Sequence, residues 1–457
     1  MKRIKKRRIH LLLFIFFLAS IIASSVQSQV PKRPNIILIT IDSLRPDHLS
    51  CYGYGRNTSP NIDNLARGGI LFAQVIAQGP ETIPSVPAVI TSHYFEIGDW
   101  FNTMDKIKDV KFSAPTIQEI LKSKGYFAIY ICGSSVLSGI KGMRQGWNKM
   151  LTFTGSGKPD AKMITDKAIE WIRRVYYKPF SLNLHYMDVH RPYTPPSNYK
   201  NIFIGDKLNF PVRHIPIVEN FCGEGGIPKA LVENGVTDLN YYIAQYDAAI
   251  KFVDDQIGLL LAELKKLALE NNTLVIITAD HGEAFGEHNF FLAHVCGLYD
   301  EFIKVPLIMK LPNGMPASKV INHQVQLIDI APTILEILGI DNNYNMKGLS
   351  LLPLITKGEG YNREYVFSAG DGISCVRTSR MKLIRYAKGN NDERYSFFNL
   401  EDDPSESVNL IDSEGEQFKH LKQELDIWLK DASKDFIVKG YSTGETKNKL
   451  KSLGYIQ

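Results

Sequence analysis

The sequence lacks a hydrophobic run long enough to span a bilayer. Its longest apolar stretch, Leu11 to Ala23, has 13 residues, whereas a transmembrane helix needs roughly 20. The basic segment MKRIKKRR precedes this stretch, and small residues follow it near Ser28. This is the pattern of a secretory signal peptide over residues 1–28, and it predicts export to the periplasm or the extracellular space. The alternative is an uncleaved membrane anchor.

The sequence also lacks a strong charge excess beyond that segment. The whole chain has a formal net charge of +5, but residues 1–28 contribute six Lys and Arg and no acid. The remainder is therefore close to neutral, near −1. Because nucleic-acid binding normally requires a basic surface, we predict no nucleic-acid partner. No pattern predicts an oligomeric state.

Cysteine is scarce, and no CxxC pair occurs among the five scattered cysteines. This excludes the common zinc and redox motifs. In an exported chain, one or two disulfides are compatible with this content. The hydrophobic content of 44% is that of a globular protein with a large core.

Several apolar runs have the length of strands that are buried on both faces. They occupy residues 35–40, 127–132, 180–186, 274–279 and 305–311. Helical patterns alternate with them. One pattern covers 113–125, with Ser113 as the expected N-cap and Gly125 as the stop, and another covers 243–267. The alternation predicts an α/β fold in which helices flank a large, mostly parallel sheet.

The last hundred residues have a different pattern. Short β-like runs at 364–369, 373–378 and 381–387 are joined by polar turns and precede an amphipathic helix. Consecutive short strands followed by a helix predict a small antiparallel subdomain. We therefore divide the chain into a catalytic domain over residues 29–360 and a C-terminal subdomain over residues 361–457.

Candidate metal ligands follow two of the predicted strands. Asp42 comes just after one strand, and Asp280 and His281 come just after another. Because ligands collect beyond the carboxyl ends of parallel strands, these side chains are expected to meet. Oxygen donors with one nitrogen suit a divalent cation, with Ca²⁺ as the first choice and Mn²⁺, Mg²⁺ or Zn²⁺ as alternatives. The structural alternative is that both aspartates cap helices.

Several segments resemble the sulfatases of the alkaline phosphatase superfamily. They are PNIILITIDSLRPDHLSCYGYGRNTSPNIDNLARGG, HYMDVHRPYTPP, NNTLVIITADHGEAFGEH and FFNLEDDPSESVNL, in the family's order. The resemblance covers nearly all of the chain after the signal segment. It implies an alkaline-phosphatase-like α/β fold, one bound divalent cation and the hydrolysis of an anionic ester.

The resemblance assigns roles to individual residues. Asp42, Asp280 and His281 match the family's metal ligands, whereas its usual second aspartate falls on Ser43, which we do not count as a ligand. His190 and His294 match substrate-facing histidines, and His190 is also a candidate proton donor.

The nucleophile segment ETIPSVPAVITS departs from the family pattern. Sulfatases carry Cys or Ser, then x-Pro-x-Arg, but here Thr82 and Val86 fill the first and last positions. Formylglycine is not expected, because oxidation of a threonine gives only a ketone. An unmodified Thr82 that also contacts the cation would act as nucleophile and favour phosphate mono- or diesters over sulfate esters. The structural alternative is that Thr82 only caps a helix or forms a turn.

We therefore expect an exported, metal-dependent hydrolase that acts on a small-molecule, glycan or lipid ester. One alternative is a transferase that moves a phospho-group from a lipid to an alcohol. The other is a binding protein that has kept the fold and lost catalysis.

Overall fold

The computed structural model describes residues 33–95, 111–153, 159–205, 213–312, 315, 318–370, 372–387, 393–413 and 415–435. The predicted signal peptide over residues 1–28 lies outside the described residues. None of the helices in the described ranges has the length and apolar composition needed to cross a membrane.

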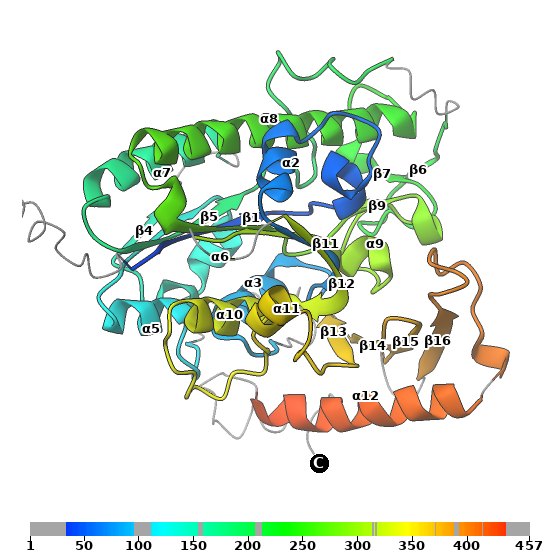
Figure 1. Cartoon of the computed structure of the whole chain (residues 1–457). Coiled ribbons are helices and arrows are strands. Elements are labelled where there is room, and N and C mark those ends of the chain that lie inside the picture. Colours follow the sequence, from blue (N-terminus) through cyan, green and yellow to red (C-terminus); the bar gives the residue numbers. More distant parts are fainter. Residues whose placement is uncertain are drawn as a thin grey trace, which may run out of the picture.

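The centre of the molecule is an eight-stranded sheet with the order β12-β2-β11-β8-β1-β5-β3-β4 (Figure 1). Its strands are β1 (Asn35–Ile41), β2 (Ile70–Ile76), β3 (Phe127–Cys132), β4 (Lys149–Thr152), β5 (Phe180–Tyr186), β8 (Thr273–Thr278), β11 (Lys304–Lys310) and β12 (Lys319–Gln326). Strand β1 pairs in parallel with β5 and β8, and all seven of its residues are buried. Its position in mid-sheet explains why its sequence is continuously apolar.

Strand β11 is the exception to the parallel arrangement, since it runs antiparallel to both β8 and β2. The prediction of a mostly parallel sheet is confirmed. We grouped residues 305–311 with the runs typical of parallel strands, and this prediction is wrong because β11 runs antiparallel to its neighbours. Composition could not show this, since a strand buried on both faces has the same composition in either direction.

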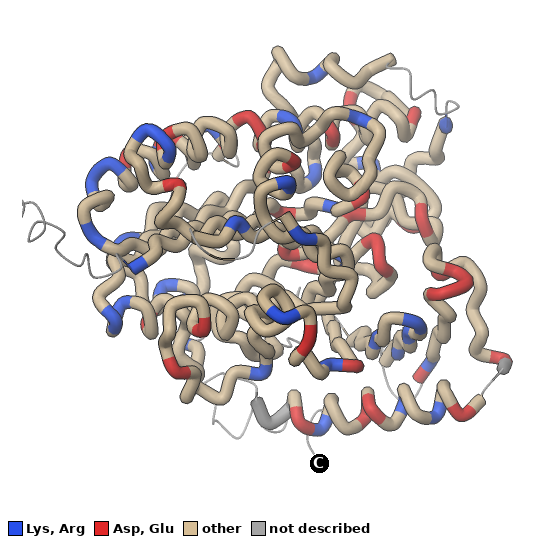
Figure 2. Tube along the Cα trace, in the orientation of Figure 1, with Lys and Arg blue, Asp and Glu red and all other residues tan. Residues whose placement is uncertain are grey.

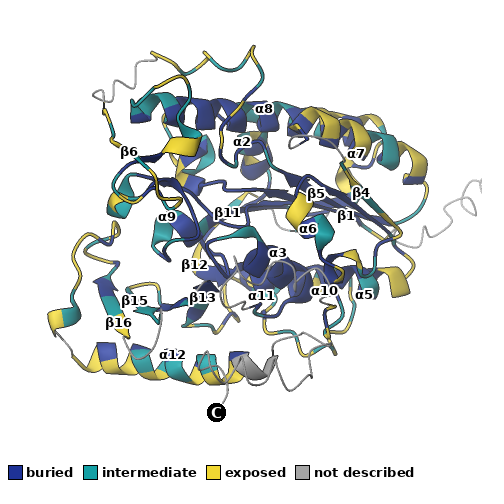
Figure 3. Ribbon diagram, turned by 180° about the vertical axis from the view of Figure 1, so that it is seen from behind, coloured by how far each residue is buried: buried dark blue, intermediate teal, exposed yellow. Residues whose placement is uncertain are grey.

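Helices cover both faces of the sheet (Figures 1 and 3). On one face lie α2 (Pro60–Arg67), α7 (Ala161–Val175) and α8 (Leu239–Lys266); on the other lie α3 (Thr82–Thr91), α5 (Ile117–Ser123), α10 (Ile330–Ile337) and α11 (Leu352–Lys357). Shorter helices are α6 (Ser135–Gly139) and α9 (Asp300–Ile303). The predicted N-cap at Ser113 is wrong: Thr116 caps α5 in a capping box with Glu119, which satisfies the free N–H groups of the first turn.

The antiparallel subdomain predicted at the C-terminus is confirmed. It contains β13 (Val366–Gly370), β14 (Ile373–Arg377), β15 (Met381–Tyr386) and β16 (Arg394–Asn399), with α12 (Glu416–Asp435) packed on one face. In Figure 2, acidic and basic residues are interspersed along α12. The subdomain also shares an apolar cluster with the large sheet, in which Ile76 and Phe302 pack with Cys375 and Ile384.

Short strands and one disulfide shape the loops near the sheet's carboxyl edge. The strands are β6 (Ile217–Val218), β7 (Ile227–Pro228), β9 (Ala284–Phe285) and β10 (Phe291–Ala293). The disulfide joins Cys222 to Cys296 and closes a separation of 74 residues.

Candidate active site

Strand pairing brings the three predicted metal ligands together. Thr40 of β1 is in register with Thr278 of β8, so Asp42 and Asp280, each two residues further on, project from the same face. Both aspartates and His281 are fully buried. One donor atom from each lies within 4.8 Å of the others. This arrangement can hold a cation.

The imidazole of His281 is oriented by its own chain. Its Nδ1 lies 2.9 Å from the carbonyl oxygen of Gly282, to which it donates. Its Nε2 therefore faces the carboxylates, 3.4 Å from Asp42 Oδ1 and 3.8 Å from Asp280 Oδ2. A histidine whose Nδ1 is bound to a carbonyl presents its Nε2 lone pair to a metal.

Ser43 arranges the same carboxylates, a role that the sequence did not suggest. Its hydroxyl donates to Asp42 Oδ1 at 2.9 Å, and its backbone N–H donates to Asp280 Oδ1 at 3.3 Å. The residue has a left-handed backbone with φ 60°, which a non-glycine residue adopts at a cost. Tyr246 of α8 donates to the Ser43 carbonyl at 2.8 Å and so holds this turn.

Two imidazoles face the two buried carboxylates. The Nε2 atoms of His185 and His281 lie 3.4–3.8 Å from carboxylate oxygens of Asp42 and Asp280. Burial alone would raise the pKa of Asp280, but the neighbouring imidazoles outweigh it and hold this pKa below its usual value. Burial lowers the pKa of His281, and the two carboxylates reverse this and raise it. Two buried carboxylates this close together attract a cation that can reach the site.

Thr82 is the first residue of α3, and Glu81 is the N-cap. The N-cap alternative for Thr82 is therefore wrong. Its Oγ1 instead donates to Asp42 Oδ2 at 3.2 Å and lies 3.5 Å from His281 Nε2. Val86, at the position of the sulfatase motif's arginine, is buried in the apolar core. The alcohol thus lies beside the cluster of ligand donors, at the positive end of a helix dipole.

The two histidines expected to face the substrate lie beside this cluster. The His294 ring centroid is 4.5 Å from that of His281 and 4.9 Å from that of His190. His294 Nδ1 lies 3.3 Å from Glu283 Oε1. Burial, reinforced by the charges of His281 and His190, lowers the pKa of His294 well below its ordinary value. Burial likewise raises the pKa of the Glu283 carboxyl.

Comparison with known proteins identifies the family. The family model described as Sulfatase matches residues 34–340, and the model described as N-sulphoglucosamine sulphohydrolase, C-terminal, matches residues 286–435. The chain belongs to the sulfatase family. It is thus a sulfatase-family ester hydrolase, as the resemblance predicted.

Individual sulfatases match over most of their length. Arylsulfatase K of Mus musculus is 26% identical, with 87% of this chain and 79% of that protein covered. The N-acetylglucosamine-6-O-sulfatase of Bacteroides thetaiotaomicron is 23% identical, with 84% of each covered.

Solved structures of this fold include enzymes with different esters. One, in complex with its substrate D-glucosamine-2-N,6-O-disulfate, has a TM-score of 0.69 at 21% identity and covers 89% of this chain and 98% of that chain. The phosphonate monoester hydrolase of Agrobacterium radiobacter has a TM-score of 0.67 at 19% identity, covering 88% and 96%. These likenesses confirm the predicted fold.

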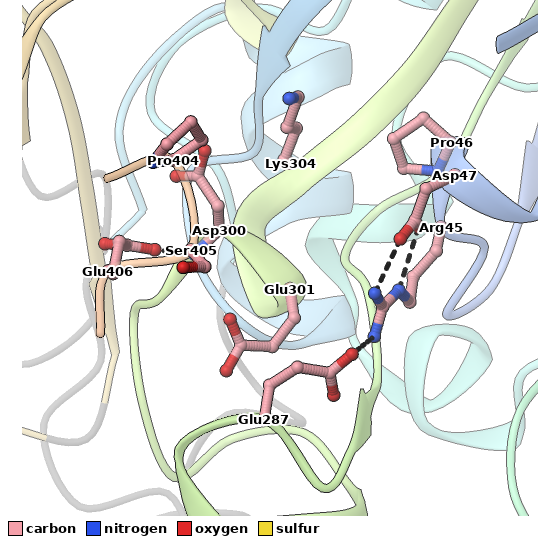
Figure 4. A pocket seen from close by; sticks show the side chains of 10 residues that line it. All are labelled: Arg45, Pro46, Asp47, Glu287, Asp300, Glu301, Lys304, Pro404, Ser405 and Glu406. Carbon is pink, nitrogen blue, oxygen red and sulfur yellow. Dashed lines mark hydrogen bonds and ion pairs between the residues drawn. The ribbon is translucent and has the colours of Figure 1, made fainter. Parts of the chain in front are cut away.

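A separate cavity of about 270 Å³ lies between Arg45 and the loop that contains Glu406 (Figure 4). Its lining includes five carboxylates, those of Asp47, Glu287, Asp300, Glu301 and Glu406. Arg45 is bound to Asp47 and Glu287, as the dashed lines in Figure 4 indicate. The lining also includes the cations Arg45 and Lys304.

Proposed function

We propose that this chain is an exported, metal-dependent hydrolase of an anionic ester, that phosphate mono- or diesters are favoured over sulfate esters, and that Thr82 is its nucleophile. The observation that carries the proposal is the position of Thr82 Oγ1, 3.2 Å from Asp42 Oδ2 and 3.5 Å from His281 Nε2.

The side chains that would hold the cation are Asp42, Asp280, His281 and Thr82. They fit a cation because Asp280 Oδ2 is buried without a hydrogen-bond partner among the described residues. The Nε2 of His281 faces the same point, because its Nδ1 is bound to the Gly282 carbonyl. When bound, a divalent cation supplies positive charge that polarises the ester and lowers the energy of the Thr82 alkoxide.

The chemistry that we propose has two steps. In the first, Thr82 Oγ1 bonds to phosphorus as the bond to the leaving oxygen breaks, and the threonine proton passes to Asp42 Oδ2, its hydrogen-bond acceptor. The leaving oxygen takes a proton from His190. That histidine's Nδ1 is bound to the Arg191 carbonyl, so the proton moves at Nε2. In the second step, water attacks phosphorus and gives a proton to His190 as the bond from phosphorus to Thr82 Oγ1 breaks. Thr82 Oγ1 takes back the proton from Asp42 Oδ2, which restores the hydroxyl and releases phosphate.

The choice of phosphate follows from the chemistry of threonine. A formylglycine hydrate can expel sulfate by elimination from its second hydroxyl, whereas a threonine ester has no such exit and must be resolved by attack at the central atom. Phosphate esters allow this attack. The structural likeness to a phosphonate monoester hydrolase supports phosphorus as the central atom. A sulfate ester, the substrate class named for other relatives, is the competing choice.

Two features support export. The first is the signal-like pattern of residues 1–28, and the second is the disulfide between Cys222 and Cys296. Disulfides persist mainly in oxidising compartments.

The test is an activity panel of aryl sulfate, aryl phosphate and diaryl phosphate, each with Ca²⁺, Mg²⁺, Mn²⁺ and Zn²⁺. We expect metal-dependent release of the aryl alcohol, fastest with a phosphate ester. Thr82→Ala should lose at least about a thousandfold in kcat, because the attacking group is absent. Thr82→Ser should keep measurable turnover. Thr91→Ala, at the other end of the same helix, is the matched control and should stay active.

A slow phosphate ester should add one phosphoryl group to the peptide that contains Thr82, detectable by mass spectrometry. Full activity of Thr82→Ala, or phosphorylation elsewhere, rules out Thr82 as nucleophile. Transfer of phosphate to an added alcohol in place of water would identify the transferase alternative. Absence of turnover with every ester and metal would favour the binding protein.

A further inference from the structure

His185 lies directly beneath the candidate metal site. It is in register with Thr40 in the neighbouring strand β1. Because side chains alternate along a strand, His185 projects from the same face as Thr40 and Asp42. The register of β1 with β8 puts Asp280 on that face as well. The imidazole therefore rises from the sheet toward both carboxylates.

The ring of His185 is buried without a hydrogen bond from the described residues, and two carboxylates lie near its Nε2. Its side chain is 1% exposed, and neither ring nitrogen has a hydrogen-bond partner among the described residues. Asp280 Oδ2 also has no hydrogen bond in that part of the chain, and the two imidazoles are 3.6 and 3.8 Å away from it. Burying polar atoms without partners is costly, about 1–3 kcal/mol for each. Buried groups of this kind indicate a ligand that satisfies them.

The distances around His185 are those between two ligands of one cation. Its Nε2 lies 3.8 Å from Asp42 Oδ2 and 3.6 Å from Asp280 Oδ2. These separations exceed the roughly 2.7–3.2 Å of a hydrogen bond. Two donors that bind one cation at about 2.0–2.6 Å lie roughly 3–4 Å apart when they occupy neighbouring positions. The spacing from His281 Nε2 to the same two carboxylates, 3.4 and 3.8 Å, is similar.

We propose that His185 Nε2 is a further ligand of the cation that Asp42, Asp280 and His281 bind. This inference rests on the proposed metal dependence. It also changes the choice of metal: two imidazoles beside two carboxylates favour Zn²⁺ or Mn²⁺ over Ca²⁺, which takes oxygen ligands. The first choice of Ca²⁺ followed from a set with a single imidazole.

The test uses the full chain stripped of metal with a chelator. Isothermal titration should give Zn²⁺ and Mn²⁺ at least about tenfold higher affinity than Ca²⁺. His185→Ala should weaken Zn²⁺ binding by about 10- to 100-fold or more. The same substitution should change Ca²⁺ binding much less. Equal losses for Zn²⁺ and Ca²⁺, or no loss, would contradict the proposal.

Pulsed electron paramagnetic resonance of the Cu²⁺-loaded protein counts coordinated imidazoles independently of activity. We expect two in the wild type, one in His185→Ala and one in His281→Ala. His48→Gln, which alters a buried histidine bonded to Asp247 outside the site, should retain two. His185→Gln serves as a second variant if the alanine variant does not fold by circular dichroism.

The outcomes separate this inference from the proposed function. One imidazole in the wild type, with tight metal binding, would mean that His185 only hydrogen-bonds the carboxylates, which overturns the inference and leaves metal dependence intact. A wild-type chain that binds none of the metals would overturn both.

Discussion

Gly282 illustrates how one residue without a side chain can hold a metal ligand in place. Its N–H donates to the Phe302 carbonyl at 2.7 Å, and its own carbonyl accepts from His281 Nδ1. A Cβ at this position would lie 2.1 Å from the Glu301 carbonyl oxygen. Because the clash would be with a backbone atom, which cannot move aside as a flexible side chain can, only glycine fits here without strain.

Gly282→Ala should displace this peptide and rotate His281 away from the carboxylates. We expect a loss of about 1–3 kcal/mol in the free energy of unfolding, typical of overpacking. We also expect at least about tenfold weaker metal binding. Urea denaturation and isothermal titration measure the two effects. Gly139→Ala is the control, because a Cβ there meets no atom within 4 Å. Unchanged metal affinity in Gly282→Ala would show that the His281 orientation does not depend on this peptide.

Among individual residues, the sequence predicts those that come directly after a strand, because the strand end fixes where they lie. Asp42, Asp280 and His281 were predicted for that reason, and the structure brings them together. Ser43 and His185 were missed as partners of these carboxylates. The role of Ser43 depends on a left-handed backbone, and that of His185 on which strand lies beside β1. Neither is a local property of the sequence. A polar histidine in the apolar segment FSLNLHY was the available signal.

At the scale of elements, the hairpin of β9 and β10 is tied to the C-terminal subdomain through His288. The His288 Nδ1 lies 2.7 Å from Glu301 Oε1, and its Nε2 lies 3.0 Å from the carbonyl oxygen of Glu406. Both partners are acceptors, so the doubly protonated imidazolium satisfies both. The ring also stacks on Tyr299, with centroids 3.6 Å apart.

This contact should make stability depend on pH. Burial alone lowers the pKa of His288, but Glu301 and the Glu406 carbonyl outweigh it and raise the pKa above the ordinary 6.5. A group with a raised folded pKa stabilises the fold fully below its unfolded pKa, and that contribution is lost as pH rises through the folded pKa. His288 should therefore add stability at pH 6 that declines as the solution becomes alkaline.

His288→Gln should reduce the fall in unfolding free energy between pH 6 and pH 9. Chemical denaturation at several pH values measures it, and His323→Gln, an exposed histidine of β12, is the control. An identical pH profile for wild type and His288→Gln would contradict the assignment.

For the whole molecule, the small sheet and the large sheet share an apolar cluster, so we expect them to form one folding unit. The cluster that contains Ile76 and Phe302 on one side includes Cys375 and Ile384 on the other. Lys382 of β15 is fully buried and ion-paired with Asp300 of α9. Cutting such a core would expose apolar surface and an unpaired charge, so the two parts should open together.

Hydrogen exchange followed by mass spectrometry tests this cooperativity. The slowest amides of β8 and β15 should exchange at similar rates. Phe302→Ala should accelerate both, because the cavity costs about 3–5 kcal/mol. Phe221→Ala, at a side chain that is 55% exposed, should accelerate neither. Exchange of β15 far ahead of β8 in the wild type would mean that the subdomain opens by itself.

The sequence predicts which segments form strands and helices better than it predicts how these elements pair and pack. Continuous apolar runs such as 35–40 and 274–279 indicate buried strands, and the short runs after residue 361 indicate an antiparallel sheet. Strand order, the reversed β11 and the shared core depend on pairings between distant segments. The boundary that we drew at residue 360 separates patterns in the sequence, and the shared core spans it.

The segment that leads into Thr82 is supported from the far end of the chain. Ser368 Oγ donates to the Ala77 carbonyl across 291 positions, and the Ala369 N–H donates to the Gln78 carbonyl. The opening residues of the site thus leave the ribosome long before the strand that supports them. A nascent or prematurely terminated chain carries Asp42 and Thr82 without that support. The segment that leads into Thr82 should therefore reach its final conformation only after synthesis has passed β13.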